Sequence, residues 1–151
     1  MKTKIIFFIS LFPMCLISML LRAQDIGVHK FIGKTKNEVI KAYGNPVHQD
    51  NSNPSMVCMF YQNKTKRMIF VSDQDGVYQS EATATYDTEE KAKGEVDTFI
   101  SGSVADGFMV DTVSINDFQV YKTGVKADLQ ITENKITKNF DVSVKAHRSE
   151  D

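Results

Sequence analysis

The chain has 151 residues, with 18 Lys and Arg against 19 Asp and Glu and a net charge of −1. This near balance, without any run of basic residues, excludes the electrostatic footprint of proteins that bind nucleic acid or an anionic lipid surface. The length suits one domain that buries roughly two thirds of the surface of its unfolded chain. Only one of the two cysteines lies beyond the apolar N-terminal segment, so that domain has no internal disulfide.

The first 23 residues are organised like a secretory signal peptide. Lys2 and Lys4 precede an apolar stretch that ends at Leu21, and the small residue Ala23 stands before polar residues. We expect cleavage after Ala23, which removes three of the 18 basic residues and leaves an exported domain, residues 24–151, with a net charge near −4 and no stable membrane span. An uncleaved membrane anchor and a lipid anchor on Cys15 are the alternatives.

The first half of the domain is predicted to be a helix followed by three strands. Thr35 and Glu38 form a capping box, and Gly44 with Pro46 ends the helix, which we place at about Lys36–Tyr43. Residues 47–55 are polar and are expected to form an exposed loop. The three strands, the last two joined by a tight turn that ends at Gly76, are Met56–Gln62, Met68–Ser72 and Val77–Tyr86.

The second half repeats this order. Asp87 with Glu90 predicts the start of a helix, and Ser101 and Gly102 predict its end. The strands that follow are Met109–Lys122, Val125–Thr132 and Ile136–Ala146. The sequence therefore predicts an α+β fold in the order α-βββ-α-βββ, with two short helices packed on one face of an antiparallel sheet.

Two details of these last strands follow from the parity of their apolar residues. A bulge or a break is expected around Asn116 and Asp117, because the apolar positions switch parity between Ile115 and Phe118 and an extra residue would keep all of them inward. In the final hairpin we expect a four-residue loop that keeps like charges apart. The loop is Thr132–Lys135, and the predicted pairs are Ile131 with Ile136, Ala127 with Phe140, Val125 with Val142, and Lys126 with Asp141.

No pattern of catalytic, metal-binding or cofactor-binding residues is present in the sequence. The three histidines, His29, His48 and His147, lack the spacing of a zinc site. Cys58 shares a strand face with Met56 and Phe60, which predicts a buried structural thiol far from any histidine. No GxSxG, glycine-rich phosphate loop or CxxC motif occurs. We therefore predict no catalytic residue, no metal and no cofactor, and a protein that is not an enzyme.

The segment IGKTKNEVIKAYGNP, residues 32–46, resembles the opening of the SmpA/OmlA small bacterial envelope domain, which is similar in fold to β-lactamase inhibitor protein. The resemblance covers about residues 32–86 and includes the aromatic pair Phe60 and Tyr61. The chain departs from that family in lacking a tryptophan before the aromatic strand residue and a lipid-bearing cysteine at the mature N-terminus. The resemblance implies a small envelope domain whose sheet or loop surface binds another protein.

These observations predict a periplasmic or secreted interaction module, of an accessory or inhibitor type, whose partner is another envelope or secreted protein and not nucleic acid. The candidate contact residues lie in the 47–55 loop and the strand after it, and they are His48, Asn51, Asn53, Met56 and Tyr61. The alternative is a small ligand-binding or hydrolytic domain with a cone-shaped cavity, as in nuclear-transport-factor-2-like folds. The aromatic residues that would line such a cavity are Tyr78, Tyr86, Phe99, Phe108 and Phe118.

Overall fold

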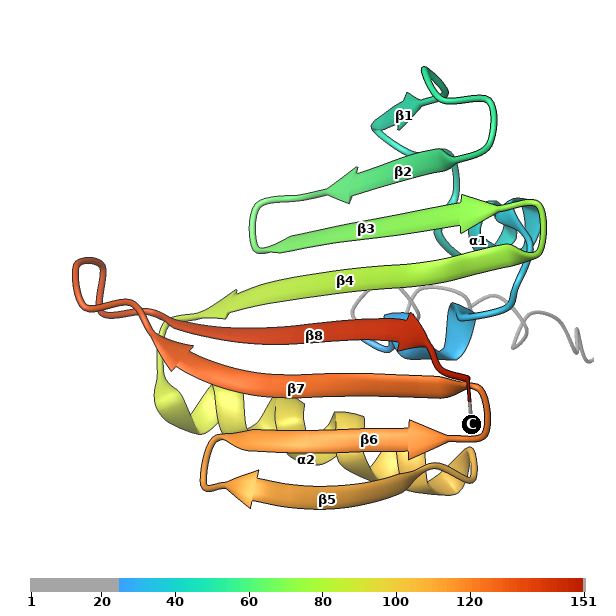
Figure 1. The fold of residues 1–151 in the computed structure, drawn as a ribbon. Coiled ribbons are helices and arrows are strands. Elements are labelled where there is room, and N and C mark those ends of the chain that lie inside the picture. The colour runs from blue at the N-terminus through green and yellow to red at the C-terminus, as the bar shows by residue number, and fades with distance from the viewer. Residues whose placement is uncertain (1–24, 151) are drawn as a thin grey trace, which may run out of the picture.

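The computed structural model describes residues 25–150, which form one eight-stranded antiparallel sheet with helices on one face (Figure 1). The expected signal peptide and its cleavage site lie outside the described residues. None of the helices in residues 25–150 has the length and apolar character needed to cross a membrane. The elements in chain order are the 3₁₀ helix η3 (Val28–Phe31), α1 (Lys36–Tyr43), β1 (His48–Asp50), β2 (Val57–Gln62), β3 (Lys66–Asp73), β4 (Gly76–Tyr86), α2 (Glu89–Ala105), β5 (Met109–Ser114), β6 (Asp117–Lys122), β7 (Val125–Glu133) and β8 (Phe140–Arg148).

The predicted order α-βββ-α-βββ is wrong, because each helix is followed by four strands and not three. β1 lies within the segment that was expected to be a loop. Its residues are polar because it is a short strand at the edge of the sheet, and only β2 pairs with it. The segment expected as one strand over Met109–Lys122 is a hairpin, β5 and β6. The number of helices agrees with the expectation, although α2, at 17 residues, is not short.

The sheet consists of two four-stranded meanders joined side by side. Its order is β1-β2-β3-β4-β8-β7-β6-β5, so β4, the last strand of the first half, pairs with β8, the last strand of the second (Figure 1). That central pairing runs over eight residue pairs, from Gln79 opposite His147 to Tyr86 opposite Phe140. Each half thus repeats a helix followed by a meander, and the two halves share one sheet.

The hydrophobic core lies between the sheet and its helices. α2 and η3 both contact β4, β7 and β8, and Tyr43 of α1 places its ring 5.4 Å from that of Phe70 on β3. The predicted capping box of α1 is present, because the Thr35 N–H donates to Glu38 at 2.8 Å and the Glu38 N–H donates to the Thr35 hydroxyl at 3.3 Å. The cap of α2 is Thr88 and not Asp87, since the Thr88 hydroxyl accepts the Lys91 N–H.

The break that the sequence predicts around Asn116 is the turn of the β5–β6 hairpin. The chain reverses at Ile115 and Asn116, and the register with β6 shifts between Thr112 and Ser114. Val113 and Ile115 are 64% and 80% exposed, so they do not face the core as expected. Because the chain turns here, the alternation of inward and outward side chains starts anew in β6. This is why the apolar residues change from odd to even positions at this point.

The register of the β7–β8 hairpin also differs from the prediction. The loop between the strands spans residues 134–139, and Ile131 lies opposite Val142 instead of Ile136, which is 93% exposed. This register places Asp128 opposite Lys145, and an opposite-charge pair is favoured across two strands. The parity was predicted correctly, because a shift by an even number of residues preserves which side chains face the core. Leu129 is accordingly buried.

Candidate binding surface

The face of the sheet opposite the helices, which we call the free face, is left uncovered by the helices of the fold. Within residues 25–150 no helix packs against it, since α2, η3 and the α1 side chain Tyr43 all contact the other face (Figure 1). In β2 the core-facing residues are Met59 and Tyr61, at 0% and 6% exposure. Because side chains alternate along a strand, Cys58 and Phe60 belong to the free face.

Apolar side chains on the free face are concentrated on β2 and β3. Phe60 lies directly opposite Ile69, and Cys58 lies opposite Val71, so the four form a contiguous cluster, all half-buried. We call these four residues the β2–β3 patch. The imidazole of His48 on β1 extends the cluster, with its ring centroid 5.5 Å from that of Phe60.

The middle of the free face is polar and carries charges of both signs. This is seen by following one row of residues across the sheet from the patch, in which each residue lies opposite the next on the neighbouring strand. The row is Ile69, Glu81, Lys145, Asp128 and Gln119. Glu81, Lys145 and Asp128 alternate in sign, which favours their pairing across the strands. Apolar side chains of the free face therefore gather at the end that adjoins β1, and Tyr121 and Met109, which lie opposite each other, occupy the far end on β6 and β5.

Four of the five predicted contact residues lie at this end of the sheet. His48 is exposed on β1, Asn51 and Asn53 are exposed in the loop that joins β1 to β2, and Met56 is half-buried at the end of that loop. Two side chains stabilise the loop by accepting hydrogen bonds from its backbone. The Asp50 carboxylate accepts the Ser52 N–H, and the Asn53 side-chain carbonyl accepts the Ser55 N–H. The loop is therefore a defined part of the surface.

Tyr61, the fifth predicted contact residue, does not lie on this surface. It faces the helices, is only 6% exposed, and donates its hydroxyl hydrogen to the Gly44 carbonyl at 3.0 Å. Burial raises the pKa of its phenol. Phe60, its neighbour in the aromatic pair, takes the surface position that was assigned to Tyr61.

A cleft of about 460 Å³ adjoins the patch between the β1–β2 loop and the turn that joins β3 to β4. Met56 and Val57 line one side, and Asp73 lines the other. Arg148 at the end of β8 binds the Asp73 carboxylate at 3.1 Å, which holds the pKa of that carboxyl below its usual range. The sequence analysis did not identify this ion pair, because its two residues are 75 positions apart.

Cys58 is half-buried on the free face, so the expectation of a fully buried thiol is wrong. Burial, and then the negative charge of Asp50 on the neighbouring strand, raise the pKa of the thiol. A nucleophilic cysteine requires a lowered pKa, so this thiol does not have the properties of a catalytic group.

The thiol of Cys58 should react slowly with iodoacetamide at pH 8 in the native protein. Its raised pKa leaves less of the reactive thiolate than an unfolded chain has. The control is Ser101→Cys in a Cys58→Ser background, since Ser101 is exposed on α2. Mass spectrometry should show labelling of Cys58 several-fold slower in buffer than in urea, with a smaller difference for the control. Equal differences would contradict the described position of Cys58.

The other titratable and aromatic candidates lie elsewhere in the fold. Among the described residues, no group of three or more His, Cys, Asp or Glu side chains is placed to hold a metal ion. His147 is exposed on β8, whereas His29 is only 1% exposed and lies on the helix side of the sheet. Phe99 and Phe108, two residues of the alternative cavity, pack on the His29 ring in the core. Sequence reasoning missed the environment of His29.

Comparisons with known proteins give only distant matches, all of them to solved structures. No family model matches the chain, and no curated protein matches it. An extracellular protein containing an SCP domain from Bacillus anthracis str. Ames matches with a TM-score of 0.45 and 12% identity, over 97% of this chain and 49% of that one. A cysteine-rich secretory protein from Staphylococcus aureus subsp. aureus Mu50 matches with a TM-score of 0.42 and 9% identity, over 76% of this chain and 44% of that one. The chain thus spans about half the length of each.

Proposed function

We propose that the protein is an exported, non-catalytic interaction module of the cell envelope, which binds a partner protein on the free face of its sheet. The observation that carries this proposal is the contiguous apolar β2–β3 patch on the free face, beside exposed His48 and the β1–β2 loop. Contiguous apolar surface rimmed by polar residues is typical of protein interaction sites. The opposite face is already occupied by the helices of the same chain.

Export to the periplasm or the exterior is supported by the signal-like N-terminus and by the point at which the folded core starts. Ile26 and Val28 are both 0% exposed, and they follow the expected cleavage site after Ala23 within a few residues. A chain cleaved there would keep every described core residue. The names of the two solved structures describe an extracellular and a secretory protein, and the resemblance of residues 32–86 to SmpA/OmlA domains supports the same kind of role.

The charge of the domain limits the kind of partner. With its signal removed, the chain has a net charge near −4, and Asp50 on β1 and Glu81 on β4 are carboxylates directly opposite members of the patch. An acidic rim favours association with a protein whose contact region is apolar at its centre and basic at its edge.

Replacement of Phe60 by alanine tests this proposal. A central aromatic side chain of an interface typically contributes 2 kcal/mol or more, so recovery of the partner from an envelope extract should fall at least tenfold. The matched control is Tyr121→Ala, because Tyr121 is an aromatic residue on β6 at the far end of the same face. Circular dichroism should show both variants folded. Equal recovery of the same partner by the Phe60 variant and wild-type protein would contradict the proposal.

A further inference from the structure

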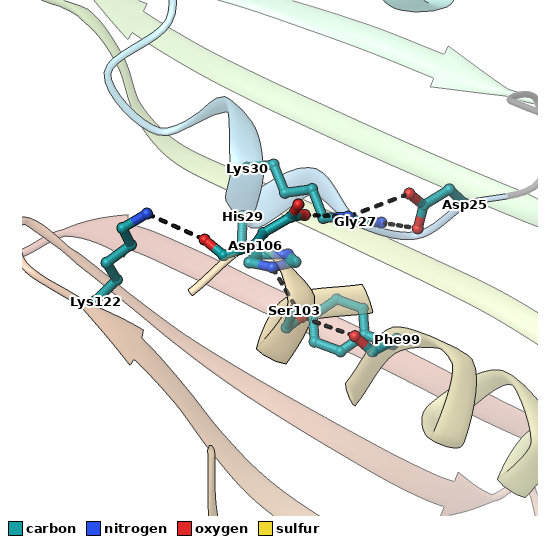
Figure 2. A network of polar contacts seen from close by, with 8 residues as sticks. All are labelled: Asp25, Gly27, His29, Lys30, Phe99, Ser103, Asp106 and Lys122. Carbon is teal, nitrogen blue, oxygen red and sulfur yellow. Dashed lines mark hydrogen bonds and ion pairs between the residues drawn. The ribbon is translucent and has the colours of Figure 1, made fainter. Parts of the chain in front are cut away.

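His29 lies at a buried junction between η3 and the C-terminal part of α2 (Figure 2). Its side chain is packed between two aromatic rings, with centroids 4.5 Å from that of Phe99 and 4.7 Å from that of Phe108. The imidazole Nε2 lies 3.0 Å from the hydroxyl oxygen of Ser103, which is itself fully buried on α2. The His29 side chain thus links the N-terminal segment to α2 by a polar contact in an otherwise apolar environment.

The hydrogen bonds of Ser103 determine the protonation of the imidazole. The hydroxyl has one hydrogen, which it donates to the Phe99 carbonyl at 2.7 Å. Nε2 of His29 must therefore carry a hydrogen and donate it to Ser103, and Nδ1 is left as a bare acceptor. Nδ1 is buried and has no hydrogen-bond partner among the described residues. A proton added there would create a buried cation whose new N–H has no acceptor, which is costly.

The charged groups around this junction do not compensate for such a cation. The Lys30 ammonium lies 2.8 Å from the Asp106 carboxylate and 3.9 Å from that of Asp25, so both carboxylates already face a cation (Figure 2). The Lys122 ammonium donates to the Asp106 carbonyl and lies 5.5 Å from the centre of the Phe108 ring. Burial first, and then the positive charge of Lys30, lower the pKa of His29 to about 4.

The segment that His29 attaches belongs to the core. Ile26 and Val28 are fully buried, and the hydroxyl of Ser80 on β4 donates to the Val28 carbonyl at 3.0 Å. η3 also contacts β7 and β8. Release of this segment would expose the apolar surface that it covers on the centre of the sheet.

We propose that His29 is an acid-sensitive latch, which holds residues 25–32 against α2 and the sheet while its imidazole is neutral and releases them when it takes up a proton. The latch lies on the helix side of the sheet, so it is independent of the function proposed for the free face. It adds to that function a response of the fold to acid.

The size of the response follows from proton linkage. The docked imidazole has the lower pKa, about 4 against 6.5 when it is free, so the docked state binds fewer protons. Docking is therefore fully favoured above pH 6.5 and weakens as the pH falls toward 4. The ratio of docked to released segment should fall by up to about tenfold for each pH unit in this range, and by about 300-fold in all once the pH is well below 4.

Hydrogen exchange of backbone amides, corrected for the pH dependence of the intrinsic rates, tests the latch in the exported protein. Opening of residues 26–32 should increase about 100-fold between pH 7 and pH 4, with a smaller change in β7 and β8. His29→Gln has no titrating group, so it should lose this acid dependence. The matched control is His147→Gln, because His147 is exposed on β8, and this variant should keep the acid dependence of the wild-type protein.

Two results would overturn the proposal. The first is an unchanged acid dependence in His29→Gln, and the second is equal opening of β7, β8 and residues 26–32, which would indicate global unfolding. If His29→Gln does not fold, NMR titration of the wild-type histidines gives the answer. A His29 pKa near 4 is expected, and an ordinary pKa of about 6.5 would overturn the latch.

Discussion

Replacement of Phe70 by alanine is expected to lower the free energy of unfolding by about 3–5 kcal/mol, the usual cost of removing a buried phenyl ring. The side chain is 0% exposed at the centre of the core of the first half. Its ring lies 5.4 Å to 5.9 Å from three other aromatic rings, and their contacts with it would be lost together. These three rings belong to Phe31, Tyr43 and Tyr61.

Phe60→Ala is the matched control for this prediction. Phe60 lies on the adjacent strand but belongs to the free face and is half-buried, so its loss should cost about 1 kcal/mol. Urea denaturation of both variants, with an unchanged slope, measures the difference. Equal destabilisation by the two substitutions would show that the faces of β2 and β3 are assigned wrongly.

Gly76→Ala is expected to destabilise the protein by about 3 kcal/mol, because two separate costs combine at this position. Gly76 has a φ of +106°, which L-residues with a side chain rarely adopt. A Cβ there would also lie 2.8 Å from the carbonyl oxygen of Lys34 and 3.0 Å from that of Gly33. These carbonyls belong to the backbone that precedes α1, and they cannot move away freely because Lys34 accepts the Val77 N–H at 2.8 Å.

Gly124→Ala separates the two costs. Gly124 also has a positive φ, +78°, but a Cβ there would meet no atom within 4 Å. Its substitution should therefore cost only about 1 kcal/mol, the strain of the backbone conformation. Thermal unfolding of the two variants gives the difference, which measures the close contact between the β3–β4 turn and the chain before α1. Equal losses in both variants would contradict that contact.

The parts of the fold that the sequence predicted correctly are those determined by interactions between residues close together in the chain. The capping box at Thr35 and Glu38 and the stop at Gly44 placed α1 correctly, because every interaction involved lies within a few residues. Alternation of apolar and polar residues predicted which side chains of β7 face the core. The same alternation could not determine the β7–β8 register, since a period of two residues is unchanged by a shift of any even number.

The parity of β2 could not be predicted from alternation because apolar side chains occupy both of its faces. Phe60 and Cys58 belong to the free-face patch, whereas Met59 belongs to the core. The sequence analysis therefore assigned Cys58 to the interior and Tyr61 to the surface. The structure reverses both assignments, and an apolar patch on a free face is the physical reason for the ambiguity.

The position of the candidate surface was predicted in part. His48, Asn51, Asn53 and Met56 share one end of the sheet, because the polar loop that contains them leads directly into β2. His29 gave no signal in the sequence, since Ser103, its hydrogen-bond partner, is 74 residues away. Contacts over such distances are made by packing of the whole domain and leave no local pattern.

Site-specific photo-cross-linking in the producing cells tests the central claim, that the free face binds a partner, most directly. A benzophenone side chain would be placed at Phe60 in the patch, at Asn53 in the β1–β2 loop, and at Asp97, which is exposed on α2. We expect Phe60 and Asn53 to give an adduct with the same envelope or secreted protein, and Asp97 to give none. Cross-linking of that protein from Asp97 but not from Phe60 would contradict the proposed function.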